Sequence, residues 1–488
     1  GGVDRLEAYR GALAAGDVDE IAVEDGNFPA DGGADAMRRV LATGARPDAV
    51  FVASDLMARG VLTVLSAAGL RVPEDVAIVG FGPVGATLAL LLREQGIRSL
   101  IIERDTEVVP FPRAAHFDDE IIRTLQNVGL GRLADRMEIP DRYSFFDVDW
   151  TMFLDRIYPK GLSDQGYAHD YMFFQPELEA DLRAELMSGP FAPTVLLGTE
   201  VLSISQDADG VTIVTSRGEH RADWLVGCDG AASIVRKAMA TTFEQLDESH
   251  EWYVVDLELT GADRPGNDPF EYCDPARIVT YVPLFGPYCR FEFDVKPGET
   301  REELETLERT QQLLEPWLTP GQYRILRNDV YRFHSLLADR WRDGRILIAG
   351  DAAHLMTPKL GQGLCNGMRD AANLGWKLAR VVDGSSSPDL LDTYELERKP
   401  PAREHVEVSA YLVGQILTRA AGAEVDSQEI VVSRQKLGLT DPADDLVGTL
   451  SRQPILADGR RMDDLLGPGY AVLARPWIEG PGIPTVTA

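Results

Sequence analysis

The feature that most constrains the fold is a short apolar strand followed by a glycine turn and a helix. Residues 76–79 form a β-branched apolar run, which is typical of a buried parallel strand. Gly80, Gly82 and Gly85 follow with the spacing G-x-G-x-x-G. Residues 86–96 then read as a helix that ends at a glycine. This order predicts the first unit of an α/β fold built on a parallel sheet.

A second strand and a terminal acid make this unit a candidate dinucleotide site. Residues 99–102 are apolar and end on Glu103, about 20 residues after the turn, where a carboxylate can accept hydrogen bonds from ribose hydroxyls. The helix N-terminus offers free N–H groups to phosphates. The alternative, an ordinary strand–turn–helix with chance glycines, does not account for the placed acid. The predicted nucleotide contacts are Gly80, Gly82, Pro83, Val84, Gly85, Glu103 and Arg104.

Charge and composition restrict the class of protein. The 488 residues carry a formal net charge of -30, which disfavours binding to nucleic acid phosphates. No apolar run reaches the roughly 18 residues of a membrane span, and the sequence shows no secretory signal pattern. The cysteines have neither metal nor redox spacing, so we expect no metal site and a cytoplasmic location. They are Cys228, Cys273, Cys289 and Cys365.

The residues before the glycine turn alternate between helical patterns, at 4–15, 34–43 and 55–68, and short apolar runs, at 21–23 and 49–52, as in an α/β fragment. Residues 46–58 and 69–81 resemble the effector-binding domain of lac-repressor-type regulators, and Asp55 matches a ligand-contacting position of that family. The resemblance covers about residues 3–81, which is only part of that domain. We therefore expect residues 1–75 to be a partial regulator-like fragment, a fusion remnant. The alternative is a sugar-responsive binding module.

Downstream patterns predict a second, antiparallel sheet. Three runs alternate polar and apolar residues, which suits a sheet with one buried face. The expected elements are a helix over 113–128, a helix from 175, a β-meander over 194–227, strands at 252–259, 277–284 and 289–295, helices over 301–318 and 363–382, and a last helical region interrupted at Pro400 and Pro401.

Three motifs stand in one order along the chain. The glycine turn is followed by Asp229-Gly230 after one strand and by Gly350-Asp351 after another, and a glycine-rich loop leads from there into a long helix. Together they resemble the FAD-dependent aromatic hydroxylases of the p-hydroxybenzoate hydroxylase superfamily, and most of all the 3-(3-hydroxyphenyl)propionate hydroxylases, over about residues 76–480. The resemblance implies bound FAD, NAD(P)H as a transient co-substrate, and hydroxylation of a phenol with O₂. The other reading is a fusion that binds FAD but hydroxylates poorly.

The resemblance also implies roles for single residues. Asp351 would accept hydrogen bonds from the ribityl chain, although a strand-end acid can equally cap a helix. Glycines in the loop after it would let the backbone pass close to the flavin ring, and the next helix start would face that ring. His116 and His354 are candidate acid–base groups, with packing histidines as the alternative. The implied cofactor contacts are Arg113, Gln175, Asp229, Gly230, Asp351, Pro358, Gly361, Gly363, Leu364, Cys365 and Asn366.

The expected fold is therefore α/β, with a Rossmann-like FAD-binding domain and an antiparallel-sheet substrate domain after the partial fragment. The substrate pocket should lie between Pro358 and the antiparallel sheet, where Tyr253, Tyr281 and Phe291 are candidates on one of its two faces. Residues 465–473 resemble the opening of a thioredoxin-like domain that aids assembly in many members of this family, and the resemblance makes a homo-oligomer one expectation. The predicted divisions are an FAD-binding domain of 76–150, 176–240 and 340–385, a substrate domain of 151–175 and 241–339, a helical region of 386–450 and a shortened tail of 451–488.

Overall fold

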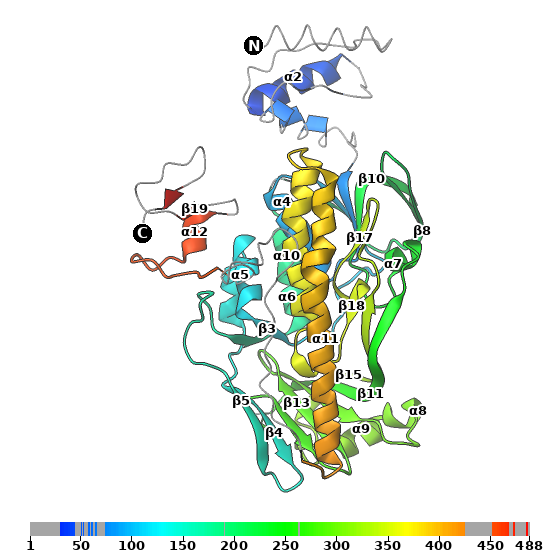
Figure 1. The fold of residues 1–488 in the computed structure, drawn as a ribbon, viewed down its shortest axis with the longest axis vertical. Helices are drawn as coiled ribbons and strands as arrows, with labels where there is room; N and C mark the ends of the chain where they lie inside the picture. The colour runs from blue at the N-terminus through cyan, green and yellow to red at the C-terminus, as the bar shows by residue number, and fades with distance from the viewer. Residues whose placement is uncertain are drawn as a thin grey trace. The chain divides into compact units, whose positions relative to one another are not determined.

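The chain divides into two compact units, Gly1–Pro73 and Glu74–Ala488, and each is described by itself. Figure 1 shows the computed structural model. It describes residues 30–43, 74–189, 191–261, 264–424 and 451–467, with the shorter stretches 50, 52, 57–58, 60–61, 64–65, 472–473 and 485–486.

The described part of the first unit contains the helix α2 (Ala30–Ala42), close to a helix expected from the sequence. Met37 of this helix is buried in a small apolar cluster with Val61, Val64 and Leu65. The helix predicted at 4–15 and the strand predicted at 21–23 lie outside the described residues.

A mostly parallel sheet forms the first half of the second unit. β1 lies at its centre and pairs in parallel with β2 and β10, so the strand shared by the two sequence resemblances belongs to this sheet. The predicted meander is present as β8, β9 and β10. The strands are β16 (Arg342–Asp343), β17 (Ile346–Ile348), β10 (Gly218–Gly227), β1 (Glu74–Val79), β2 (Ser99–Ile102) and β7 (Thr194–Leu196) in spatial order, with β8 (Val201–Gln206) and β9 (Val211–Thr215) attached.

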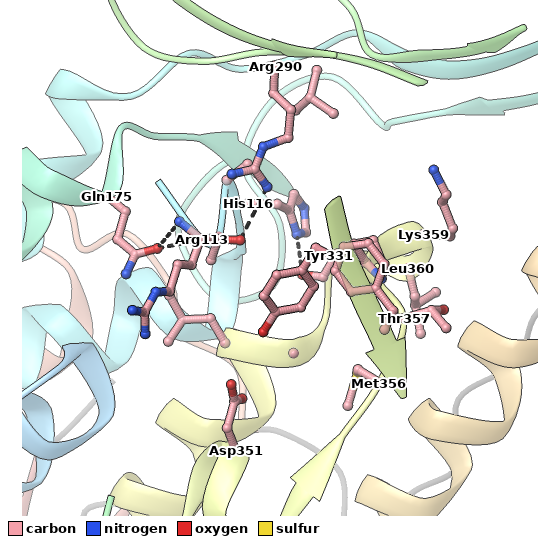
Figure 2. A pocket seen from close by; sticks show the side chains of 18 of the residues that line it. Arg113, His116, Gln175, Arg290, Tyr331, Asp351, Met356, Thr357, Lys359 and Leu360 are labelled. Atoms are coloured by element: carbon pink, nitrogen blue, oxygen red, sulfur yellow. Dashed lines mark hydrogen bonds between the residues drawn. The ribbon is translucent and has the colours of Figure 1, made fainter. Parts of the chain in front are cut away.

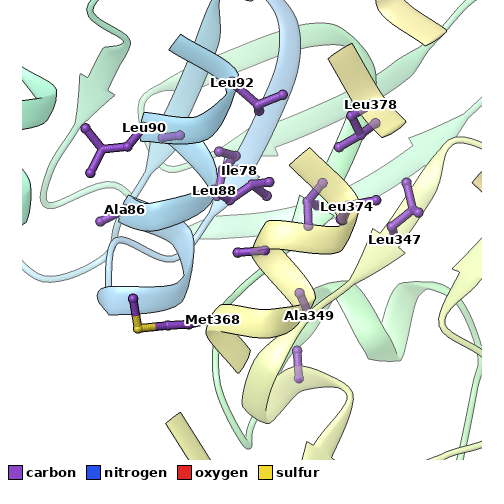
Figure 3. Packing of buried hydrophobic residues seen from close by; sticks show 14 of the residues in the cluster. Ile78, Ala86, Leu88, Leu90, Leu92, Leu347, Ala349, Met368, Leu374 and Leu378 are labelled. Carbon is purple, nitrogen blue, oxygen red and sulfur yellow. The ribbon is translucent and has the colours of Figure 1, made fainter. Parts of the chain in front are cut away.

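Two helices, α4 (Pro83–Glu94) and α10 (Gly363–Val382), pack together against this sheet (Figure 3). Ile78 of β1, Leu88 of α4 and Leu374 of α10 are fully buried in one apolar core. Each such side chain contributes about 1.5–3 kcal/mol through removal from water. This core fixes the glycine turn, which joins β1 to α4, relative to the start of α10.

An eight-stranded sheet forms the second half, so the predicted fold class is confirmed. It is antiparallel except where β12 and β4 run parallel. β4 lies in this sheet although the predicted division placed residues up to 150 with the FAD-binding domain. In spatial order the strands are β18 (His354–Leu355), β15 (Tyr323–Ala338), β11 (Phe243–Leu259), β14 (Tyr288–Asp294), β13 (Ile278–Pro283), β12 (Phe270–Cys273), β4 (Arg142–Asp147) and β5 (Met152–Ile157).

The helix predicted from residue 113 begins later in the structure. His116–Asp118 forms the strand β3, which pairs with β6 (Asp170–Met172), and α5 (Asp119–Asn127) follows. The Asp118 carboxylate accepts a hydrogen bond from the Ile121 N–H and so caps the helix. The sequence pattern did not reveal β3 because its partner lies far along the chain.

Two other helix predictions were wrong in detail. The helix expected over 301–318 is split into α8 (Arg301–Leu304) and α9 (Leu307–Leu314), because Thr306 caps the second one. α11 (Asp392–Ala420) continues through Pro400 and Pro401, which we expected to interrupt it. Each proline removes one helical donor, but α11 packs along α10 with Tyr394 and Ala402 fully buried.

The remaining described elements are short. None of the helices within the described ranges has the length and apolar character needed to cross a bilayer. These elements are the helices α6 (Gln175–Leu186), α7 (Ile234–Ala238) and α12 (Met462–Leu466), the strands β19 (Val472–Leu473) and β20 (Thr485–Val486), and the 3₁₀ turns Gly131–Arg136, Gly350–Ala352, Pro358–Leu360 and Pro388–Leu391.

Candidate active site

One cavity of about 380 Å³ connects the two halves of the second unit. Its walls come from the glycine turn, the segment 113–116, the loop 355–364 and the strands β13, β14 and β15. Figure 2 shows the cavity with the labelled side chains that surround it. The cavity therefore lies at the carboxyl ends of the parallel strands, where open α/β sheets bind ligands.

The glycine turn has the shape that a pyrophosphate site requires. Gly80 has a φ of +103°, and a Cβ there would lie 2.4 Å from the Cys228 carbonyl oxygen. A Cβ at Gly85 would lie 2.2 Å from the Gly80 oxygen, so the helix can start this close only with glycine. Gly82 lines the cavity, and a Cβ at this position would meet nothing within 4 Å. No side chain caps α4, so its first N–H groups are left for a ligand.

Glu103 stays close to this turn but outside the cavity wall. One carboxylate oxygen accepts a hydrogen bond of 2.7 Å from the Phe81 N–H, and the other accepts one of 3.0 Å from the Asp105 N–H. A carboxylate oxygen can accept more than one bond, so both retain capacity for ribose hydroxyls. Arg104 is exposed beside it and lies 3.9 Å from Asp105.

Gln175 holds the segment that carries Arg113. Its Oε1 accepts hydrogen bonds of 2.8 Å and 2.7 Å from the N–H groups of Arg113 and Ala114 (Figure 2). Its Nε2 donates to Glu179 at 2.7 Å. The exposed Arg113 side chain lines the cavity, and no carboxylate among the described residues lies within ion-pair distance of it. A guanidinium in this setting is suited to a phosphate.

The two predicted aspartates differ in their surroundings. The Asp229 carboxylate accepts hydrogen bonds from the Ser233 hydroxyl at 2.5 Å and the Ile234 N–H at 2.7 Å. This carboxylate therefore accepts hydrogen bonds at the start of α7, while the neighbouring residue Gly230 lines the cavity. Asp351 lines the cavity with its side chain exposed to it, as a contact for hydroxyl groups requires.

The loop before α10 passes closely over His116. Gly361 has a φ of +71°, and a Cβ on it would lie 2.9 Å from the His116 Nδ1. Pro358, Gly361, Gly363 and Leu364 line the cavity, and no side chain caps the start of α10. The described N-terminus of this helix therefore has N–H groups free to face a bound group.

Two predicted contacts of this loop lie behind it. Cys365 is buried, with its Sγ 3.6 Å from the His116 carbonyl oxygen, and burial raises the pKa of this thiol. Asn366 is also buried, and its Nδ2 donates to the Gln362 carbonyl oxygen at 2.9 Å. Neither residue belongs to the cavity wall, so both support the loop through its backbone.

The two candidate histidines occupy different places. His116 is part of the cavity wall, with Nε2 2.7 Å from Asp170 and Nδ1 3.1 Å from the Gly361 oxygen. His354 is buried outside that wall, with its Nε2 2.7 Å from Asp370. Burial alone would lower the pKa of His116, but the hydrogen bond and charge of Asp170 outweigh burial, and this pKa is raised to about 10.

The wall formed by the antiparallel sheet contains a buried charge network that the sequence analysis missed. The Lys359 ammonium lies 3.0 Å from Glu292 and 3.3 Å from Glu271. The Tyr143 hydroxyl donates to Glu271 at 2.6 Å. Lys359 also lies over the Trp252 ring at 3.8 Å. Acids in otherwise apolar strands were the available signal, because a buried charge requires a partner.

The sheet face that meets the cavity is now defined. Thr280 and Val282 line it, whereas their neighbour Tyr281 points into the apolar core on the other face. The candidates Tyr253 and Phe291 are buried in that same core. Alternation along a strand therefore excludes all three from the cavity wall.

The fold and the cavity together define a class: an enzyme that holds a dinucleotide cofactor against a second, antiparallel sheet. Comparison with known proteins makes this class specific. Residues 74–409 match the FAD binding domain family, and residues 1–92 match the periplasmic binding protein-like domain family. The structure places the overlap of these matches in the second unit.

The chain is similar in sequence to known hydroxylases. The 3-(3-hydroxy-phenyl)propionate/3-hydroxycinnamic acid hydroxylase of Mycolicibacterium smegmatis is 35% identical over 83% of this chain and 77% of its own. The enzyme of that name from Comamonas testosteroni is 38% identical over 69% of this chain and 57% of its own.

Solved structures of flavin enzymes share the fold. Aklavinone-11 hydroxylase, in complex with FAD and aklavinone, is 25% identical with a TM-score of 0.70 and covers 83% of this chain and 84% of its own. p-Nitrophenol 4-monooxygenase PnpA from Pseudomonas putida is 27% identical with a TM-score of 0.64, over 73% and 90% of the two chains. The chain thus belongs to the FAD-dependent aromatic hydroxylases, and its cofactor is FAD, as the sequence motifs predicted.

Proposed function

We propose that this FAD-dependent aromatic monooxygenase hydroxylates a phenol that carries a short carboxylate side chain. The observation that supports the proposal is a single cavity that runs from the glycine turn to a charged wall and includes Arg156. The relatives named above are hydroxylases of 3-(3-hydroxyphenyl)propionate and 3-hydroxycinnamic acid. Both of those molecules combine a phenol with a carboxylate.

The residues at one end of the cavity fit FAD. We infer that the free N–H groups beyond Gly82 and the Arg113 guanidinium hold the pyrophosphate, and that Asp351 holds the ribityl hydroxyls. Glu103 would hold the ribose, and the loop 358–364 would lie along the flavin ring. When bound, FAD supplies the redox chemistry that couples NAD(P)H oxidation to transfer of one oxygen atom from O₂.

The charged wall, which includes Lys359, forms the other end of the cavity. Lys359 is 3% exposed and lies between two acids, and Arg290 bonds to Asp256 at 2.8 Å. Such paired charges are costly to move, so this wall presents the Tyr143 and Thr280 hydroxyl groups in fixed positions. We infer that these hydroxyls orient the phenol and that the surrounding apolar side chains exclude water from it.

Arg156 is the residue best placed to bind the substrate carboxylate. It lies on β5 opposite Tyr143, and its guanidinium lies 5.2 Å from the Tyr158 ring centre. Its side chain is exposed, and no acid among the described residues pairs with it. A guanidinium binds a carboxylate through two parallel hydrogen bonds.

The test is NAD(P)H consumption by the FAD-loaded protein with 3-(3-hydroxyphenyl)propionate, with mass spectrometry of the product. We expect one added oxygen atom per NAD(P)H consumed. Consumption that yields hydrogen peroxide and no hydroxylated product from any phenol would contradict the proposed reaction. Sedimentation would show whether the protein forms a homo-oligomer, which stays a prediction. The cytoplasmic location stays a prediction as well.

A matched pair of substrates and variants tests the carboxylate. Loss of a charge-assisted hydrogen bond costs about 1.5–3 kcal/mol, so Arg156→Gln should raise KM for the propionate about 10- to 150-fold. It should leave KM for 3-ethylphenol unchanged. Arg332→Gln is the control, because Arg332 also lines the cavity and is exposed. An equal effect of Arg156→Gln on both substrates would refute a carboxylate contact.

A further inference from the structure

The His116 ring lies between two hydrogen-bond acceptors. Its Nδ1 is 3.1 Å from the Gly361 carbonyl oxygen, and its Nε2 is 2.7 Å from an Asp170 carboxylate oxygen (Figure 2 shows the ring in the cavity wall). A carbonyl oxygen only accepts, and an ionised carboxylate only accepts. Both ring nitrogens must therefore carry hydrogen for both bonds to form, which makes the ring an imidazolium.

The charges around the ring favour the same state. Asp118 follows on the same strand, and Glu120 lies on α5. Both pair with Arg369 of α10, at 2.5 Å and 2.6 Å. Arg369 is thus shared by those two acids, while Asp170 of β6 pairs with the ring itself. The other titratable group in contact is Cys365, whose buried thiol has a raised pKa and stays neutral.

The remaining neighbours do not reverse this balance. His405 of α11 lies near Asp118 and Arg369, and burial lowers its pKa to about 3, so it is neutral. Tyr158, which precedes β6 and faces Asp170, has its pKa raised by burial and is neutral as well. The His116 side chain is itself only 11% exposed, so solvent screens these charges weakly.

The ion pair is oriented relative to the cavity. His116 lines the cavity, whereas Asp170 is 5% exposed and lies behind it, outside the wall. The positive end of the pair therefore faces the cavity. The uncapped N-terminus of α10, at Gly363, lines the same region and carries a partial positive charge of its own.

We propose that His116 is a constant imidazolium that Asp170 holds in place, and that it acts as a positioning residue by setting a fixed positive charge under the loop 358–364. This charge favours the more negative, reduced state of bound FAD over the oxidised state. The inference goes beyond the proposed function, because it does not depend on which phenol is hydroxylated. It also differs from an acid–base role, since the ring keeps its proton.

Nitrogen-15 NMR of the histidine-labelled, FAD-loaded protein measures directly whether each ring nitrogen of His116 is protonated. The chain has seven histidines, and His116→Gln identifies the relevant signals by their loss. We expect both ring nitrogens of His116 to be protonated from pH 6 to pH 9. A ring with one bare nitrogen at pH 7 would overturn the proposal, whether or not the protein hydroxylates a phenol.

The midpoint potential of bound FAD tests the consequence. His116→Gln keeps a donor for one acceptor but removes the charge. It should weaken the binding of reduced FAD about tenfold relative to oxidised FAD, which lowers the two-electron potential by about 30 mV. An unchanged potential would contradict the proposal. His354→Gln is the control, because His354 lies outside the cavity wall. The midpoint potential of FAD bound to this variant should match that of FAD bound to the unmodified protein.

A second variant tests the proposal independently if His116→Gln does not bind FAD. Asp170→Asn removes the acid and leaves the ring, so the imidazolium should lose its proton within the usual range near pH 6.5. The potential of bound FAD should then fall between pH 6 and pH 8 more steeply than in the unmodified protein. Parallel pH profiles of the two proteins would refute a charge held by Asp170.

Discussion

At the scale of single residues, the sequence predicted contacts whose geometry is local and missed those that depend on the meeting of two sheets. Gly80, Gly82 and Gly85 lie in one turn, so their spacing alone indicated the turn, of which Gly82 lines the cavity. Lys359 and Glu271 are far apart in sequence and become partners only because the turn Pro358–Leu360 meets the antiparallel sheet. No single-sequence pattern specifies that meeting, although a buried acid such as Glu271 signals that a cation must lie nearby.

The raised pKa of His116 predicts how the free energy of unfolding depends on pH. Its pKa in the folded protein is about 10, above the value near 6.5 of an unfolded histidine. The folded state thus holds this proton more tightly, and the contribution is fully present below pH 6.5 and is lost as pH rises toward 10. The free energy of unfolding, measured by urea titration, should fall between pH 7 and pH 10. The fall should be smaller in His116→Gln, and equal slopes would contradict the prediction.

At the scale of elements, long periodic segments were predicted well and their ends were not. The strand β1 and the helices α4 and α10 lie where their apolar patterns placed them. The start of α5 was wrong because β3 pairs with the distant β6. The prolines of α11 did not end the helix, because its packing on α10 outweighs the lost donors.

The contact between α4 and α10 depends on a small residue. A Cβ at Gly375 of α10 would lie 3.1 Å from the Leu91 Cβ of α4, so a branched side chain must push the helices apart. We expect Gly375→Val to lower the free energy of unfolding by about 1–3 kcal/mol, as overpacking does. Because α10 begins at the cavity loop, FAD affinity should fall as well.

Gly414 of α11 supplies the matched control for that substitution. It is exposed, and a Cβ there would meet nothing within 4 Å. Gly414→Val should therefore change the free energy of unfolding by less than about 0.5 kcal/mol, since only helix propensity differs. Urea unfolding of both variants gives the comparison. A loss of equal size at the two positions would show that helix propensity, and not the contact with α4, decides the result.

At the scale of the whole molecule, the sequence joins two family resemblances at one strand, and the structure assigns that strand. Residues 74–92 fall within both family matches. β1 starts at Glu74, and its ladder partners are β2 and β10 of the second unit. The later motifs Asp229-Gly230 and Gly350-Asp351 already assigned this strand to the FAD-binding domain. Its pairing with residues 148 positions later, such as Val226 opposite Ile78, confirms that assignment.

This assignment predicts the effect of removing the first unit. A chain that lacks residues 1–73 keeps β1 and every ladder partner of it, so it should bind FAD and hydroxylate within about twofold of the full chain. A chain that lacks residues 1–81 loses the central strand and Gly80, and we expect no FAD binding, because the glycine turn is then unsupported. Flavin absorbance after gel filtration distinguishes the two. Loss of flavin from the shorter deletion would mean that the first unit contributes to the cofactor site, and the division at Pro73 would then be structural but not functional.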